Sequence, residues 1–242
     1  MKTLYNMNAP QYRLGDAVLF PETNWGEHAR NQILSNPDLF KDSLAYEYLS
    51  KVKDNNYIFD KKIFTLSLEK YSKNLGINSA KKDQLCIHLR MGDSKAFRGS
   101  LDSIVNYVSS LIKEPGSIIN SVKLITALHF GKNFLVRTTN ELYLKRIRES
   151  FNLISSLGFK LKELGVQVIL PGLDQDLIMS GEGLAERADK DLCKLYCSSF
   201  LILGEGHFSL CAGLVSKGKV FIPPWVENPD ASIYMKQLFE KR

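Results

Sequence analysis

The sequence has 242 residues, of which 44% are hydrophobic and 24% are charged, a composition that is ordinary for a globular chain of one large or two small domains. It contains no run of about 18 apolar residues, which excludes a predicted membrane-spanning helix. The net charge of +6 is dispersed, and the basic residues are not interleaved with aromatic ones, so a nucleic-acid binder is the least favoured class.

The cysteines predict neither disulfides nor a metal site. Cys193 and Cys197 lie four residues apart in a helical pattern, but no histidine or second cysteine pair completes a zinc set, and Cys86 and Cys211 lie far away. Residues 1–6 lack the apolar run of a signal peptide. We therefore expect buried free thiols in a reducing cytoplasm and no metal held by these cysteines.

The first third of the chain has the weaker pattern. Residues 14–20 predict a Gly-Asp turn that runs into an apolar segment, and residues 24–31 gather polar side chains that fit either a cleft or a capped loop. Residues 42–53 have helical spacing, whereas residues 57–68 are ambiguous between strand and helix. Residues 73–79 resemble a helix end followed by a linker.

From residue 84 onward, predicted strands and helices alternate. The expected strands are residues 85–89, 122–128, 166–170, 200–203 and 219–222. The expected helices are residues 100–112, 139–164, 185–197 and 208–216, with a break near Gly158 left open. This alternation predicts an α/β fold with a parallel sheet that carries helices on both faces. We expect an N-terminal lobe over residues 1–80 and a Rossmann-like domain over residues 81–242.

The first candidate site is the segment 84–93, Gln-Leu-Cys-Ile-His-Leu-Arg-Met-Gly-Asp. In a strand, His88 and Arg90 share one face, and a buried cationic group is costly unless it has a partner. A turn then brings Asp93 close, and an Arg90–Asp93 salt bridge that only ties this turn is the alternative. Because ligands of open α/β sheets bind at the carboxyl ends of strands, the segment predicts a binding site.

The second candidate site is residues 204–209, Gly-Glu-Gly-His-Phe-Ser, between a predicted strand and a predicted helix. Backbone N–H groups at a helix N-terminus form a natural phosphate seat, to which Ser209 adds a hydroxyl and His207 a possible cation. An α/β connection also uses such glycines for geometry alone. In the preceding helix, Asp191 either meets a ribose or base, or serves the helix dipole as an exposed charge.

Both segments resemble motifs of one family. Residues 88–93 resemble the His-x-Arg-x-Gly-Asp signature of the fucosyltransferase-type glycosyltransferases, which include the α-1,2- and α-1,6-fucosyltransferases and the protein O-fucosyltransferases. The run from Asp191 to Ser209 resembles the later family motif, an Asp-Leu helix, a strand and a Gly-x-Phe-Ser-like turn. The resemblance covers residues 84–225, and residues 14–20 are faintly similar to the family's early Gly-Asn turn.

The resemblance implies a GT-B-like arrangement, with a C-terminal doubly wound parallel sheet and a reduced N-terminal α/β lobe on the acceptor side. It implies transfer of fucose or a related deoxyhexose from a nucleotide-sugar donor, expected to be GDP-fucose, to a glycan hydroxyl with inversion. The resemblance implies no metal and no cofactor, with the nucleotide sugar as a substrate. Arg90 would be catalytic, because it would bind the donor diphosphate and offset the charge of the leaving nucleotide. The implied donor-binding residues are His88, Arg90, Asp191, His207, Phe208 and Ser209.

The base that accepts the proton of the acceptor hydroxyl is not fixed by the sequence. Asp93 is the favoured catalytic candidate, because it lies close to Arg90 in the motif. Asp16, Glu27 and His28, from the first lobe, are the alternatives on the acceptor side.

Three other functions stay open. Asp174 and Asp176 form an Asp-x-Asp after a predicted strand, which a metal-dependent GT-A glycosyltransferase uses to hold a divalent cation and a diphosphate. A transferase of the polysaccharide-pyruvylating kind also has two α/β lobes and late glycine and histidine turns. The third is a module that binds nucleotide sugars without catalysis.

Overall fold

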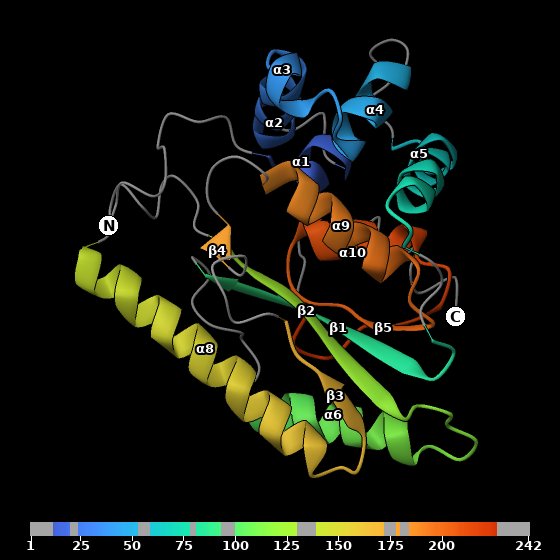
Figure 1. Ribbon diagram of the computed structural model, residues 1–242, viewed down its shortest axis with the longest axis vertical. Coiled ribbons are helices and arrows are strands. Elements are labelled where there is room, and N and C mark those ends of the chain that lie inside the picture. Colours follow the sequence, from blue (N-terminus) through green and yellow to red (C-terminus); the bar gives the residue numbers. More distant parts are fainter. Residues whose placement is uncertain are drawn as a thin grey trace.

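The chain forms one parallel sheet flanked by helices in the computed structural model, which describes residues 12–19, 24–52, 59–77, 81–92, 100–129, 139–171, 178–179 and 184–226 (Figure 1). Its strands are β1 (Gln84–Gly92), β2 (Ser121–His129), β3 (Gln167–Ile169), β4 (Ile178–Met179), β5 (Phe200–Ile202) and β6 (Lys219–Phe221). They lie in the order β3-β2-β1-β5-β6, with β4 beside β2, and every pairing is parallel. The predicted α/β fold with a parallel sheet is confirmed.

Helices cover both faces of the sheet, as predicted (Figure 1). On one face lie α6 (Leu101–Lys113) and α8 (Asn140–Lys162), and on the other lie α9 (Leu184–Tyr196) and α10 (His207–Val215). Helix α8 continues through Gly158, where a Cβ would lie 2.8 Å from a methyl carbon of Leu170. This glycine therefore lets Leu170 pack against the helix and does not interrupt it. No helix in the described ranges is long and apolar enough to cross a membrane.

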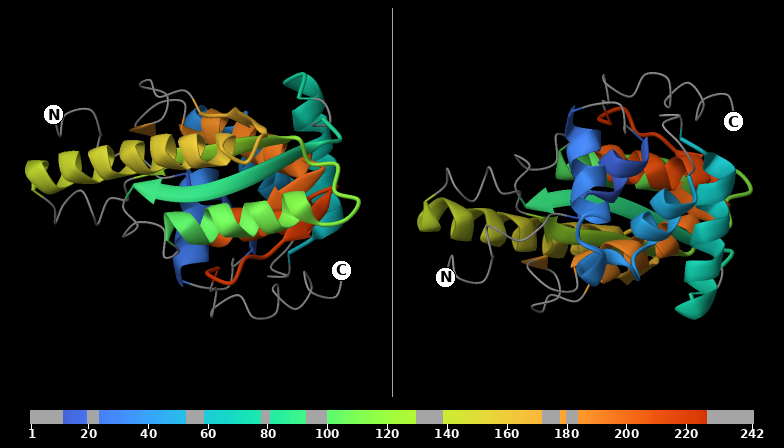
Figure 2. Two further views of the ribbon diagram at one scale, coloured as in Figure 1. Left: turned by 90° about the horizontal axis from the view of Figure 1, so that it is seen from below. Right: turned by 90° about the horizontal axis from the view of Figure 1, so that it is seen from above.

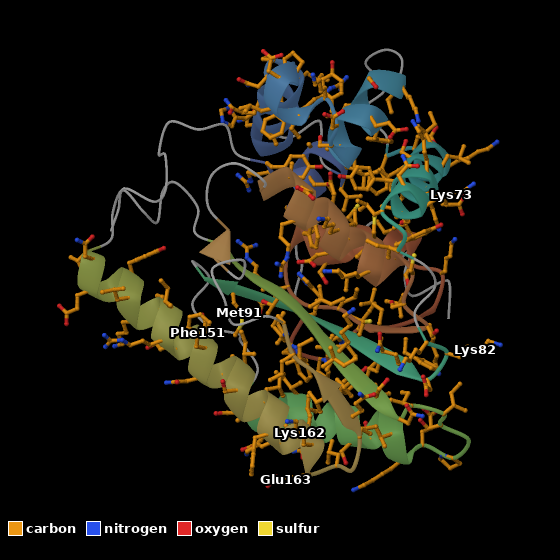
Figure 3. All side chains as sticks on the ribbon, viewed as in Figure 1. Lys73, Lys82, Met91, Phe151, Lys162 and Glu163 are labelled. Carbon is orange, nitrogen blue, oxygen red and sulfur yellow. The ribbon has the colours of Figure 1, made fainter. Side chains whose placement is uncertain are left out.

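Alternation along β1 separates two cores. Leu85, Ile87, Leu89 and Met91 belong to the cluster that packs against α6 and α8. Figure 3 shows Met91 at the carboxyl end of β1, near Phe151 of α8 and at the opposite end of the sheet from Lys82. Cys86 belongs to the cluster on the α9–α10 face, the face that His88 shares by the strand period.

The N-terminal helices form a further layer over α9 and α10, on the side away from α6 and α8 (Figures 1 and 2). They are α1 (Leu14–Leu19), α2 (Asn24–Leu34), α3 (Pro37–Phe40), α4 (Leu44–Lys51) and α5 (Lys61–Asn74). Residues 14–19 are thus a helix and not the expected turn, because Leu14, Ala17 and Val18 form one apolar stripe that is buried in the core shared with α10.

This layer differs from the expected N-terminal α/β lobe. Among the described residues between 12 and 77 every regular element is a helix. Residues 61–68 of the ambiguous segment 57–68 lie in α5, whose first turn Asp60 caps through the backbone N–H of Ile63 at 2.9 Å. The layer shares one hydrophobic core with α9 and α10. A division of the chain at residue 80 stays a prediction.

A buried carboxyl group joins the N-terminal layer to α9. Asp189 is fully buried and accepts hydrogen bonds from the hydroxyl of Tyr12 at 2.5 Å and from the backbone N–H of Leu44 at 2.8 Å. The hydroxyl of Tyr12 in turn accepts from the backbone N–H of Ala45 at 3.1 Å, so the pair caps the first turn of α4. Burial raises the pKa of Asp189 to about 7, although its bonds to Tyr12, Leu44 and Tyr71 act in the opposite direction.

We predict that Asp189→Asn destabilises the fold by about 1–3 kcal/mol at acid pH, because an amide offers one acceptor where the carboxyl offers two. Folding raises this pKa from 3.8 to about 7, so the folded chain binds the proton more tightly within that window. The contribution of Asp189 to wild-type stability then falls by up to about 1.4 kcal/mol per pH unit as pH rises across it, and the variant lacks this pH dependence.

The measurement is urea unfolding of both proteins from pH 5 to pH 8, with the exposed Asp38→Asn on α3 as the control for removal of a carboxyl group. The difference in unfolding free energy between wild type and Asp189→Asn should shrink as pH rises. A difference that grows with pH would show that the ionised carboxylate is the stabilising form.

Candidate functional site

The topology of the sheet indicates where a ligand site is expected. The chain passes from β1 to β2 and β3 on one side and then returns to build β5 and β6 on the other side of β1. In open α/β sheets the connections after the two strands at such a reversal diverge, and the ligand crevice lies at their carboxyl ends. The carboxyl end of β1 carries His88 and Arg90, and the carboxyl end of β5 leads into residues 204–209. Residues 88–92 and 204–209, which belong to the two sequence motifs, therefore lie at neighbouring strand ends where the strand order reverses, which we call the switch point.

The turn between β5 and α10 is closed by its own side chains. Gly206 is the N-cap of α10 and has a φ of 90°, a conformation that favours glycine. Ser209 is fully buried, and its hydroxyl accepts a hydrogen bond from the backbone N–H of Gly204 at 2.8 Å. Ser209 therefore shapes the turn from inside. Its predicted contact with a phosphate stays a prediction.

His88 is buried beneath this turn, with 9% of its surface exposed. Its ring lies 5.4 Å from the ring of Phe208, and a Cβ on Gly204 would lie 2.9 Å from its Nδ1. Burial lowers the pKa of His88 to about 4; the carboxylate of Asp191 acts against this shift, and the charge of Arg90 adds to it. The imidazole is therefore neutral at physiological pH. Its Nδ1 has no hydrogen-bond partner among the described residues.

Arg90 lies two residues further along the same strand face and is exposed. A Cβ on Gly206 would lie 2.8 Å from Nη1 of Arg90, so the guanidinium group passes directly over the glycine turn. This places a planar cation beside the N-terminus of α10, where backbone N–H groups and the helix dipole already favour an anion. A guanidinium group binds phosphate oxygens through two parallel N–H bonds.

A second polar cluster includes His207, the residue that follows Gly206. Oδ1 of Asp16 lies 2.7 Å from Nδ1 of His207, and Oδ2 accepts a hydrogen bond from Nε of Arg13 at 3.0 Å. Burial alone would raise the pKa of Asp16, but the hydrogen bond to His207 and the charge of Arg13 outweigh it and hold the pKa below its ordinary value. Asp16 is therefore a carboxylate that links α1 to the first residue of α10.

The contact between α1 and α10 depends on Gly15. A Cβ at this position would lie 2.6 Å from the carbonyl carbon of His207 and 2.6 Å from the backbone nitrogen of Phe208. The two backbones therefore touch, and this close approach brings Asp16 to His207.

The other sequence candidates fall into three groups. Asp191 is buried, and its two oxygens accept from Arg187 at 3.0 Å and Lys194 at 2.7 Å on the same helix, while its charge acts on His88. Glu27 and His28 are exposed on α2, and no hydrogen bond or ion pair in the described part of the chain joins them to the site. The remaining candidates, Asp93, Asp174 and Asp176, lie outside the described residues.

The structure adds Arg13, which the sequence did not single out, and makes Gly15 a helix contact where the sequence predicted a turn. The signal for Arg13 is the spacing Arg13-x-x-Asp16, which pairs the two side chains once residues 14–19 are known to be helical. Within the described ranges, no three His, Cys, Asp or Glu side chains are grouped so that they could hold a metal ion. All four cysteines are buried and free, as expected.

We predict that Gly15→Ala lowers the free energy of unfolding by about 1–3 kcal/mol, because the new methyl group meets backbone atoms that cannot turn away. Gly158→Ala is the matched control, since its methyl group would meet only the flexible end of Leu170. Helix propensity alone favours alanine over glycine by about 1 kcal/mol at either position. The measurement is the free energy of unfolding of both variants by denaturant. A Gly15→Ala variant more stable than wild type would mean that α1 does not depend on this contact.

Comparisons of this chain with protein-family models, with curated proteins and with solved structures found no match.

Proposed function

We propose that this chain is a glycosyltransferase that transfers a sugar, fucose or a related deoxyhexose, from a nucleotide-sugar donor to a glycan hydroxyl. GDP-fucose is the expected donor, and the transfer inverts the anomeric centre without a metal ion. In this proposal the arrangement is GT-B-like, with the nucleotide sugar on the sheet side and the acceptor approaching from the N-terminal helices.

The observation that carries the proposal is the place of Arg90. It lies in the His-x-Arg-x-Gly-Asp segment, at the carboxyl end of the central strand, beside the switch point and over the N-terminal turn of α10. Transfer from a nucleotide sugar releases a diphosphate whose negative charge grows in the transition state. A guanidinium group and helix N–H groups that converge on one point are suited to that charge.

His88 supports the same role as a neutral group. Because its imidazole is buried and uncharged, it can form a hydrogen bond with a nucleotide sugar at the turn. This avoids the cost of burying a second cation beside Arg90. Phe208 packs against this ring and holds it in place. Asp191 is paired with Arg187 and Lys194 on its own helix. We therefore expect it to act on the nucleoside indirectly, through its charge on His88.

We predict that GDP and GDP-fucose raise the melting temperature, because a ligand that binds only the folded state stabilises it by about 2.7 kcal/mol at a concentration 100 times its Kd. The measurement is a thermal-shift panel of GDP-, UDP- and dTDP-sugars, with and without EDTA. The shift should be several degrees and unchanged by EDTA. A shift that needs a divalent cation would favour a metal-dependent glycosyltransferase, and no shift with any donor would contradict the proposal.

We predict that Arg90→Lys lowers kcat by about a hundredfold or more, because lysine keeps the charge but not the two parallel N–H groups. The melting temperature should change little, since Arg90 is exposed. Arg148→Lys, an exposed position on α8, is the matched control. If Arg90 only ties a turn, the variant instead melts earlier while each folded molecule keeps its activity.

A further inference from the structure

Resting on the transferase function proposed above, we infer that His207 is the general base that takes the proton of the acceptor hydroxyl, and that Asp16 is the residue that positions it. The sequence placed His207 with the donor and left the base among Asp93, Asp16, Glu27 and His28. The structure brings His207 and Asp16 together from opposite ends of the chain, 191 positions apart.

The contact with Asp16 determines which ring nitrogen of His207 carries the proton. Arg13 and His207 hold the pKa of Asp16 below its ordinary value, so Asp16 is ionised and can only accept hydrogen bonds. Nδ1 of His207, 2.7 Å from Oδ1, must therefore be the N–H donor of this pair. In the neutral ring, the basic nitrogen is then Nε2. A carboxylate that fixes the tautomer and stabilises the protonated ring is the arrangement by which histidine bases are held in enzymes.

Asp16 itself is poorly suited to act as the base. Its two oxygens are engaged, Oδ1 by His207 and Oδ2 by Arg13, and its side chain is only 15% exposed. The lowered pKa also makes it a weak base. The side chain of His207 is more exposed, at 27%, so of the two groups the imidazole is the one that an acceptor can reach.

The positions of His207 and Arg90 relative to Gly206 support the assignment. His207 follows Gly206, and the guanidinium group of Arg90 lies against Gly206. The cation for the leaving diphosphate and the proposed base therefore flank one residue at the N-terminus of α10. Among the described residues, Asp16 of α1 contacts His207, and Arg13, which precedes α1, contacts Asp16. Glu205 precedes Gly206 in the chain.

In the proposed reaction, the acceptor oxygen gives its proton to Nε2 of His207 and forms a bond to the anomeric carbon of the sugar. The bond from that carbon to the phosphate oxygen breaks, and its electron pair leaves with the nucleoside diphosphate beside Arg90. The imidazolium that results is paired with the carboxylate of Asp16, and it returns its proton to solvent before the next turnover.

The decisive variant is His207→Asn. The side-chain nitrogen of asparagine occupies nearly the place of Nδ1, so the variant keeps the hydrogen bond to Asp16 and loses only the basic nitrogen. We expect kcat to fall by about 10²–10⁴-fold, with the melting temperature and the affinity for GDP close to those of wild type. Asp16→Asn should lower kcat by about 10–100-fold, because the tautomer is no longer fixed. Asp38→Asn, exposed on α3, is the control.

Kinetics with GDP-fucose and a glycan acceptor, GDP calorimetry and ¹⁵N NMR of the histidine rings separate the outcomes. The wild type should show the Nδ1–H tautomer at His207, and its kcat should fall at acid pH, while the residual activity of His207→Asn should not. A His207 with the proton on Nε2, or a variant that loses GDP affinity in proportion to kcat, overturns the assignment while the transferase function stands. A wild type that binds no donor and transfers no sugar refutes the transferase function itself.

Discussion

The backbone contact between α1 and α10 at Gly15 sets the spacing on which the candidate site depends. A methyl group at this position would lie 2.6 Å from backbone atoms of His207 and Phe208, so α1 can reach α10 only because this residue has no side chain. That approach brings Asp16 within 2.7 Å of His207. The N-terminal helices therefore supply a polar group directly to the turn that follows β5, and they do more than cover the hydrophobic face of α9 and α10.

The sequence was informative where structure is local. From residue 84 onward, apolar runs bounded by glycine and proline predicted the strands and helices, and the period of a strand predicted that His88 and Arg90 face the same way. The N-terminal third was harder, because α1 has six residues and α3 four, lengths at which a helix owes its stability to tertiary packing. The pair of Asp16 and His207 could not be predicted, since neither segment alone contains its partner. Ser209 was recognised as polar, but its bond to Gly204 depends on how the turn folds.

Two acidic residues on α9 have different structural roles because tertiary structure gives them different partners, which the sequence alone does not reveal. Asp189 and Asp191 lie two positions apart and are both buried. Asp191 is surrounded by Arg187 and Lys194 and acts on His88, whereas Asp189 faces the N-terminal layer and is bonded to Tyr12 and Leu44. The same residue type thus serves the sheet side and the outer side of one helix, with different partners on each side.

The burial of His88 and Asp189 on the two sides of the α9–α10 layer has a consequence for how folding exchanges protons with solvent. Folding lowers the pKa of His88 from 6.5 to about 4, so this group favours the fold above pH 6.5 and loses that contribution as pH falls. Folding raises the pKa of Asp189 from 3.8 to about 7, so its contribution is lost as pH rises. Between about pH 4 and 6.5 one group releases a proton on folding and the other takes one up. The two slopes cancel, and the chain folds as if it moved a proton internally from an imidazole to a carboxylate.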